Sequence, residues 1–278
     1  MNYAARVPAL AKINLSLRVL GRRSDGYHEL RTVFQSIALH DTLTIRRERG
    51  PLRLECGDPE FPADRSNLIW RAAQRAWTAA GRSGAPQDIV IAVVKRIPIA
   101  AGLGGGSSDA AATLSALARL WRVDRGRLPA LAASLGADVP YFLVGGTVLG
   151  LERGDLLFPL VDEPNWWVTL VIPSFTVSTK DAFAWYDEDS RMRARGVFTN
   201  DLEASVRRRH PEIARIVVGL RRAGALQAAM TGSGSAVFGL FGRRREAARA
   251  AAELARPSRH TLVTRTVARD EFRTLAAK

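Results

Sequence analysis

The feature that most limits how this chain can fold is a glycine-dense segment at residues 98–109, which reads PIAAGLGGGSSD. A short apolar run at 88–94 predicts a buried strand before it, and amphipathic spacing at 109–121 predicts a helix after it. Glycine has no side chain, so backbone N–H groups here can approach an anion, and a helix N-terminus attracts negative charge. The segment therefore predicts a phosphate site, with Ser107, Ser108 or Asp109 capping the helix.

Two widespread phosphate-binding patterns do not fit this segment. A P-loop requires lysine and then serine or threonine after its last glycine, whereas Gly106 is followed by Ser107. The dinucleotide-binding pattern requires glycine or alanine where Ser107 stands. A flexible glycine loop without a ligand stays open as the alternative.

The rest of the chain predicts an α+β protein in two lobes. Residues 11–20 alternate apolar and polar side chains, which predicts a half-buried strand with Lys12 and Asn14 on one face. Strands and helices then mix without a regular strand–helix–strand order, which favours α+β over a doubly wound sheet. Further strands are predicted at 32–39, 41–47, 52–56, 147–151, 166–172, 236–241 and 261–267, and further helices at 67–80, 127–135, 180–186, 211–223 and 246–254. Two prolines within 156–165 suggest a boundary between domains 1–160 and 161–278.

Composition narrows the class of protein further. The single cysteine, Cys56, cannot form an intramolecular disulfide, and no apolar run reaches the length of a membrane span, so a cytoplasmic protein without a membrane partner is expected. The net charge of +14 is typical either of nucleic-acid binding or of attraction for anionic small molecules. Only four of the 41 basic residues are lysines, and Lys12 is the one in a predicted strand near the chain start.

Four segments resemble the sequence motifs of the GHMP kinases: PALAKINLSL at 8–17, the glycine-dense segment, SLGADVPYF at 134–142 and MTGSGSAVFGL at 230–240. The resemblance implies a two-lobed GHMP kinase fold. Its N-terminal lobe would be like the second domain of ribosomal protein S5, and its C-terminal lobe would be ferredoxin-like. The resemblance also implies that ATP binds with Mg²⁺.

The same resemblance assigns roles to individual residues. Lys12 matches the lysine beside the transferred phosphoryl group, and Asp138 matches the catalytic aspartate. Independently of the resemblance, Ser107 or Ser108 could supply a hydroxyl to a magnesium ion that bridges phosphates, and Ser108 is the preferred candidate. The residues expected to contact ATP are Pro98, Ile99, Ala100, Ala101, Gly102, Leu103, Gly104, Gly105, Gly106, Ser107 and Ser108. Without the resemblance, an exposed strand lysine and a helix-capping aspartate are the simpler interpretations.

Two more segments point to the acceptor substrate. GRRSDGYHEL at 21–30 and PSFTVSTKDAF at 173–183 resemble the GHMP kinases that phosphorylate the 2-hydroxyl of a cytidylyl-methylerythritol in the non-mevalonate isoprenoid route. There two aromatic rings enclose cytosine and a histidine bonds to it, which suits a planar pyrimidine. The substrate residues implied are Asn14, Tyr27, His28, Thr179, Phe183, Gly232 and Ser233.

Two other functions stay open at this stage. One is a GHMP kinase for another alcohol, such as homoserine or mevalonate, which would not need Tyr27, His28 or Phe183. The other is a nucleic-acid binder that uses the S5-like lobe and the positive charge, although no nucleic-acid partner is the favoured expectation. The sequence leaves monomer and homodimer equally open.

Overall fold

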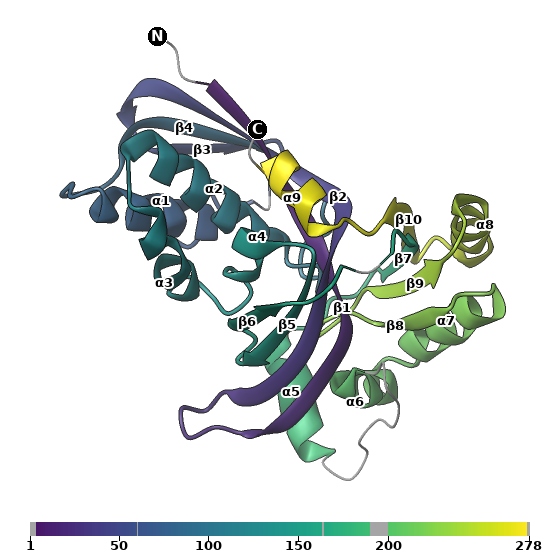
Figure 1. The fold of residues 1–278 in the computed structure, drawn as a ribbon. Coiled ribbons are helices and arrows are strands. Elements are labelled where there is room, and N and C mark those ends of the chain that lie inside the picture. Colours follow the sequence, from purple (N-terminus) through teal and green to yellow (C-terminus); the bar gives the residue numbers. More distant parts are fainter. Residues whose placement is uncertain (1–3, 60, 163, 190–199, 277–278) are drawn as a thin grey trace.

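A computed structural model describes residues 4–59, 61–162, 164–189 and 200–276. Two long antiparallel strands, β1 (Ala4–Arg22) and β2 (His28–Pro51), run through the molecule, and both lobes are built around them (Figure 1). The first sheet has the order β3-β4-β2-β5-β6, with β1 also paired to β2. Its other strands are β3 (Arg53–Cys56), β4 (Gln87–Val94), β5 (Thr147–Glu152) and β6 (Leu156–Pro159).

Strand β2 differs from the prediction, which divided it into two strands. The pairing partner of β1 shifts from His40 at Leu10 to Ile37 at Ala11. This β-bulge leaves Ala38 and Leu39 without a partner on β1, while the strand itself continues. The prediction of two strands, at 32–39 and 41–47, therefore missed that one strand continues through the bulge.

Four helices cover one face of the first sheet (Figure 1). They are α1 (Leu68–Ala79), α2 (Gly105–Trp121), α3 (Leu128–Ala133), which follows the 3₁₀ turn η1 (Arg125–Arg127), and α4 (Tyr141–Val144). Helix α1 begins at Asn67, whose side chain accepts from the Ile69 N–H at 2.9 Å, close to the predicted start. The predicted cap of α2 is wrong: the cap is Gly104, with φ of 73° and no side-chain hydrogen bond.

The second lobe is ferredoxin-like, as predicted. Its strands β7 (Trp167–Pro173), β8 (Gln227–Met230), β9 (Val237–Phe241) and β10 (Arg259–Arg265) form an antiparallel sheet in the order β10-β7-β9-β8. With helices between β7 and β8 and between β9 and β10, this is a β-α-β-β-α-β arrangement. The helices are α5 (Thr179–Glu188), α6 (Asp201–Arg209), α7 (Pro211–Arg222) and α8 (Arg244–Leu254), and α9 (Arg269–Ala276) ends the described chain.

Strand β1 is buried on both faces, which corrects the half-buried prediction. One face contributes Ala11, Ile13 and Leu15 to a core shared with β7 and β9 of the second lobe. The opposite face carries Lys12 and Asn14, which are only 3% and 2% exposed. The two lobes therefore share a core along β1, and the strand's polar face is left for a site between them. In the described part of the chain, no helix is both long and apolar enough to span a bilayer.

Candidate active site

A cavity of ≈ 1090 Å³ lies between the lobes, and residues from both lobes line it. Its wall includes the whole predicted ATP loop up to Ser107, together with Lys12, Asp138 and every predicted substrate residue. Ser108 is the one predicted site residue outside this wall. Segments that are far apart in sequence thus meet around a single space, large enough for two substrates.

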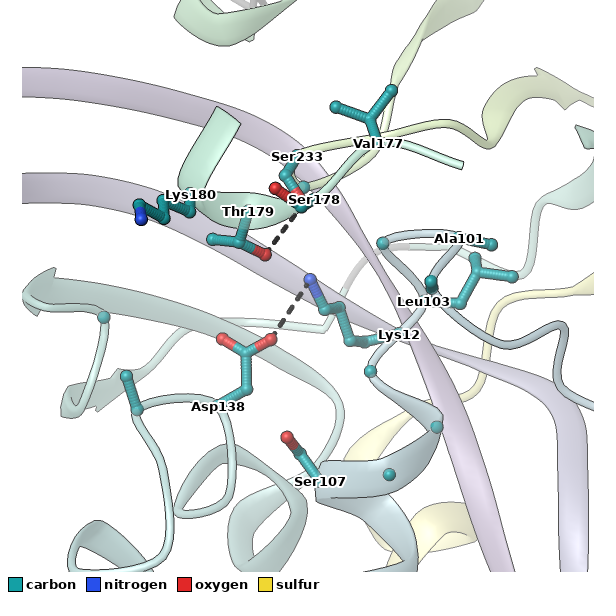
Figure 2. Close-up of a pocket in the computed structure, with 18 of the residues that line it drawn as sticks. Lys12, Ala101, Leu103, Ser107, Asp138, Val177, Ser178, Thr179, Lys180 and Ser233 are labelled. Carbon is teal, nitrogen blue, oxygen red and sulfur yellow. Dashed lines mark hydrogen bonds and ion pairs between the residues drawn. The ribbon is translucent and has the colours of Figure 1, made fainter. Parts of the chain in front are cut away.

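Lys12 and Asp138 meet at the centre of this cavity (Figure 2). The Lys12 Nζ lies 3.5 Å from Asp138 Oδ2 and 5.5 Å from the centre of the Phe34 ring. The interpretation of Lys12 as an exposed strand lysine is therefore wrong. The helix-cap interpretation of Asp138 also fails, because α4 is capped at Pro140 without any side-chain bond. The Asp138 side chain is 36% exposed, so it can reach a bound ligand.

Asn14 fixes the position of the Lys12 ammonium. Its Oδ1 accepts a 2.7 Å hydrogen bond from Lys12 Nζ and a 3.3 Å bond from the Thr231 hydroxyl, while its Nδ2 donates to the Thr32 hydroxyl at 2.7 Å. With both ends of the carboxamide bonded to protein, Asn14 is better placed to orient Lys12 than to bind substrate. Period-2 alternation did indicate that the two side chains share a face, and this is confirmed.

The glycine loop packs directly on the loop after β8. A Cβ at Gly102, where φ is +77°, would lie 2.3 Å from the Thr231 carbonyl oxygen, and the Ala236 N–H donates to the Ala101 carbonyl at 3.2 Å. Strand β1 also holds the loop, through a hydrogen bond from the Lys12 N–H to the Leu103 carbonyl at 3.0 Å. The loop is therefore held in place by both lobes, which rules out the flexible-loop alternative for these residues.

Helix α2 presents an uncapped N-terminus to the cavity. Its first intrahelical bond runs from the Ser108 N–H to the Gly104 carbonyl at 2.9 Å, so the N–H groups of Gly105, Gly106 and Ser107 have no partner within the helix. No side chain caps them, and all three residues line the cavity. Three N–H donors that find no acceptor in the described part of the chain, together with the positive end of the helix dipole, favour a phosphate group.

Ser107, and not Ser108, is the serine of this segment that lines the cavity. Ser108 is 2% exposed, and its hydroxyl donates to the Leu10 carbonyl at 2.7 Å, away from the cavity. Ser107 lines the cavity, and Figure 2 shows its side chain extending from α2 toward Asp138. The prediction of Ser108 as a magnesium contact is not supported, since its hydroxyl already serves the fold.

The predicted base-binding side chains lie at the far end of the cavity. His28 stacks on Phe183 with ring centres 4.6 Å apart and planes 18° apart, and its Nε2 lies 2.8 Å from Asp187 Oδ1. One face of Phe183 is thus covered by His28. Tyr27 is 57% exposed and lies under the Arg153 guanidinium, 5.4 Å from the ring centre.

Three predicted substrate residues remain: Thr179, Gly232 and Ser233. Thr179 lies at the start of α5, and Ser233 lies in the loop after β8. Their hydroxyl oxygens lie 3.2 Å apart, above Lys12 (Figure 2). Gly232 lies close enough that a Cβ there would come 3.4 Å from Lys12 Nζ. Thr179, Ser233 and Gly232 therefore line the side of the cavity that lies next to the Lys12–Asp138 pair.

A buried ionic group beside α2 was not predicted. Lys95 Nζ bonds to Asp109 Oδ2 at 2.8 Å and to Asp41, and Asp41 Oδ1 also accepts from the N–H groups of Arg96 and Ile97. Asp41 and Asp109 are 0% and 2% exposed. Burial raises the pKa of the Asp109 carboxyl to about 7, against the opposing effect of Lys95 and with a smaller contribution from Asp41. The rarity of lysine in this chain, used above for Lys12 alone, is the one sequence signal that could have drawn attention to Lys95.

We expect Asp109→Asn to gain stability relative to the wild type as pH rises from 5 to 8. The carboxyl's ordinary pKa is 3.8, so between pH 4 and pH 7 the folded chain holds this proton while the unfolded chain loses it. The free energy of unfolding of the wild type therefore falls across that range. An asparagine does not titrate, so the variant does not show this decrease. The relative gain should be about 1–3 kcal/mol, measured by urea unfolding at both pH values. Parallel pH profiles for the two proteins would contradict the role assigned to Asp109.

Comparisons with known proteins agree with this geometry. The chain matches the family model described as GHMP kinases N terminal domain over residues 67–146, and the one described as GHMP kinases C terminal over 186–260. A 4-diphosphocytidyl-2-C-methyl-D-erythritol kinase of Moorella thermoacetica is 43% identical, covering 94% of this chain and 98% of its own. The enzyme of that name from Pseudomonas aeruginosa is 41% identical over 91% of each chain.

Solved structures give the same result at the level of the fold. A crystal structure of 4-(cytidine 5'-diphospho)-2C-methyl-D-erythritol kinase superposes with a TM-score of 0.79 at 35% identity, covering 94% of this chain and 99% of that one. A homoserine kinase from Cytophaga hutchinsonii, at 18% identity and a TM-score of 0.72, shares the fold alone. With a GHMP architecture, a helix N-terminus that opens uncapped on the cavity and relatives of one name along nearly its whole length, the chain belongs to the 4-diphosphocytidyl-2-C-methyl-D-erythritol kinase family of the GHMP kinases.

Proposed function

We propose that this chain transfers the γ-phosphoryl group of ATP to the 2-hydroxyl of 4-diphosphocytidyl-2-C-methyl-D-erythritol, in the non-mevalonate route to isoprenoid precursors. One observation carries the proposal: a single cavity holds the glycine loop at one end, the aromatic side chains at the other, and Lys12 with Asp138 between them. A phosphoryl donor and a cytidylyl acceptor would therefore meet at the ion pair.

The proposed chemistry assigns one task to each member of the pair. The Asp138 carboxylate accepts the proton of the attacking hydroxyl, as a positioned base does in phosphoryl transfer. The Lys12 ammonium lies 3.5 Å from that carboxylate, so it stabilises negative charge on the group being transferred. Asn14 holds Lys12 through the 2.7 Å bond between Oδ1 and Nζ.

The glycine loop and the α2 N-terminus would hold the triphosphate. A Mg²⁺ ion that arrives with the nucleotide would need few protein ligands, as is usual in kinase sites. The Ser107 hydroxyl faces the same space as Asp138 and would be the protein oxygen that suits this ion (Figure 2). When bound, Mg²⁺ would neutralise part of the phosphate charge. Among the described residues, no group of three or more His, Cys, Asp or Glu side chains could hold a metal ion.

The division into domains is also a proposal. We place the boundary at residues 160/161, because β6 ends the first sheet at Pro159 and β7 begins the second sheet at Trp167. The 156–165 segment that suggested this boundary also contains β6. We expect a cytoplasmic enzyme, in keeping with its single cysteine.

An ADP-release assay with a panel of alcohols tests the proposal. Purified protein with ATP and Mg²⁺ should release ADP with 4-diphosphocytidyl-2-C-methyl-D-erythritol and not with homoserine or mevalonate. Phosphorus NMR of the product should show a new phosphate monoester on a tertiary alcohol carbon. Equal or greater turnover of homoserine or mevalonate would reject the acceptor while keeping the kinase class.

A further inference from the structure

Arg153 stands in the turn between β5 and β6, beside the tip of the β1–β2 hairpin. The register that pairs Glu152 with Leu30 brings this turn next to Tyr27. The guanidinium lies 5.4 Å from the centre of the Tyr27 ring, and both residues line the cavity. Its NH2 group also donates to Asp155, a carboxylate that is 12% exposed. Arg153 is thus anchored at Asp155 and covers the tyrosine ring.

The Tyr27 side chain has little else to hold it. Its backbone is fixed by the turn, through the 3.0 Å bond from its N–H to Asp25 Oδ1 and the 2.8 Å bond from the Arg23 N–H to its carbonyl. Within the described residues, its ring contacts no other ring and its hydroxyl forms no hydrogen bond. With 57% of the residue exposed, an unsupported ring would sample several rotamers and would lose that freedom on binding a base.

We propose that Arg153 is a positioning residue for base recognition: it covers one face of the Tyr27 ring and holds the other face ready for a stacked pyrimidine. This inference rests on the proposed function, because it takes cytosine as the base. A cation over an aromatic face is attractive, and fixing the ring in advance reduces the entropy lost when cytosine stacks. His28 covers one face of Phe183, which makes the orientation of Tyr27 the more important.

Steady-state kinetics of a double-mutant cycle test the inference. Arg153→Met, which removes the cation but keeps a long side chain, should raise KM for the cytidylyl substrate about three- to tenfold. The values of kcat and of KM for ATP should stay within about twofold of the wild type. Arg153→Lys should recover part of the loss, because it restores a cation. In a Tyr27→Ala background, Arg153→Met should have no further effect on KM.

A matched control comes from Arg82, whose guanidinium lies 4.6 Å from the Trp77 ring centre and outside the cavity. Arg82→Met should leave the kinetics unchanged. The inference is overturned if Arg153→Met leaves KM unchanged. It is equally overturned if the loss persists undiminished in the Tyr27→Ala background, since Arg153 would then act on the substrate's phosphates directly.

Calorimetric binding of cytidine diphosphate, with a non-hydrolysable ATP analogue saturating the other site, separates this inference from the proposed function. If the wild type does not phosphorylate the cytidylyl alcohol, the proposed function fails. Weaker binding of cytidine diphosphate by Arg153→Met, again only with Tyr27 present, would still support the inference. Unchanged binding would reject it whether or not the enzyme is active.

Discussion

Asp138→Asn is expected to lower kcat by about a hundredfold or more while changing the affinity for ATP little. Asparagine has nearly the shape of aspartate, and its amide oxygen can still face Lys12 Nζ, which lies 3.5 Å from the carboxylate in the wild type. It cannot take up a proton from the attacking hydroxyl. The loss should therefore fall on the chemical step, seen as a reduced single-turnover rate with ATP and acceptor both bound.

Two controls separate loss of the base from general damage. Asp181→Asn removes a carboxylate from the first turn of α5, outside the cavity wall, and should keep wild-type turnover. Thermal unfolding of Asp138→Asn should remain close to that of the wild type, because the Asp138 side chain is partly exposed. Turnover within a few fold of the wild type in Asp138→Asn would remove the base assignment.

Local patterns predicted the parts of the site that lie along one element. Alternation in β1 places Lys12 and Asn14 on one face, and the structure joins them by a hydrogen bond. The dense glycines before α2 predicted a phosphate-facing helix. The helix starts at Gly105, earlier than predicted, because glycine is a poor helix former and only contacts with the rest of the fold recruit it. A Cβ at Gly105 would lie 3.0 Å from the Ile97 side chain, which shows how closely the turn is packed.

Contacts between distant segments could not be read from such patterns. Lys12 lies on β1 and Asp138 lies in the loop between α3 and α4, and only the resemblance to known motifs predicted that they meet. Strands β6 and β8 have four residues each, too short for a clear period. Arg153 lies in a turn, where no periodicity marks the direction of a side chain. The ionic group of Lys95, Asp41 and Asp109 could not be predicted, because its members come from distant segments and only the folded chain buries them together.

The second large effect concerns Lys12, and Lys12→Met is expected to lower kcat by about 10²–10³-fold. Methionine keeps most of the side chain's length but removes the positive charge, which in the wild type lies 5.5 Å from the centre of the Phe34 ring. Asn14 Oδ1 keeps its bond from Thr231, so the loss of the ammonium leaves no unpaired oxygen there. The fold should survive, with a cooperative thermal transition, and catalysis should not.

Lys12→Arg should not restore activity, which distinguishes placement of the charge from its mere presence. A Cβ at Gly104 would come 3.2 Å from Lys12 Cε, and one at Gly232 would come 3.4 Å from its Nζ, so backbone closes around the ammonium on two sides. A planar guanidinium is too large for that space and cannot imitate a point charge. Lys180→Met, at an exposed lysine on the cavity rim, serves as the control and should keep most of kcat. A Lys12→Met enzyme within tenfold of wild-type kcat, or full rescue by arginine, would show that the buried ammonium acts on the fold and not on the phosphoryl group.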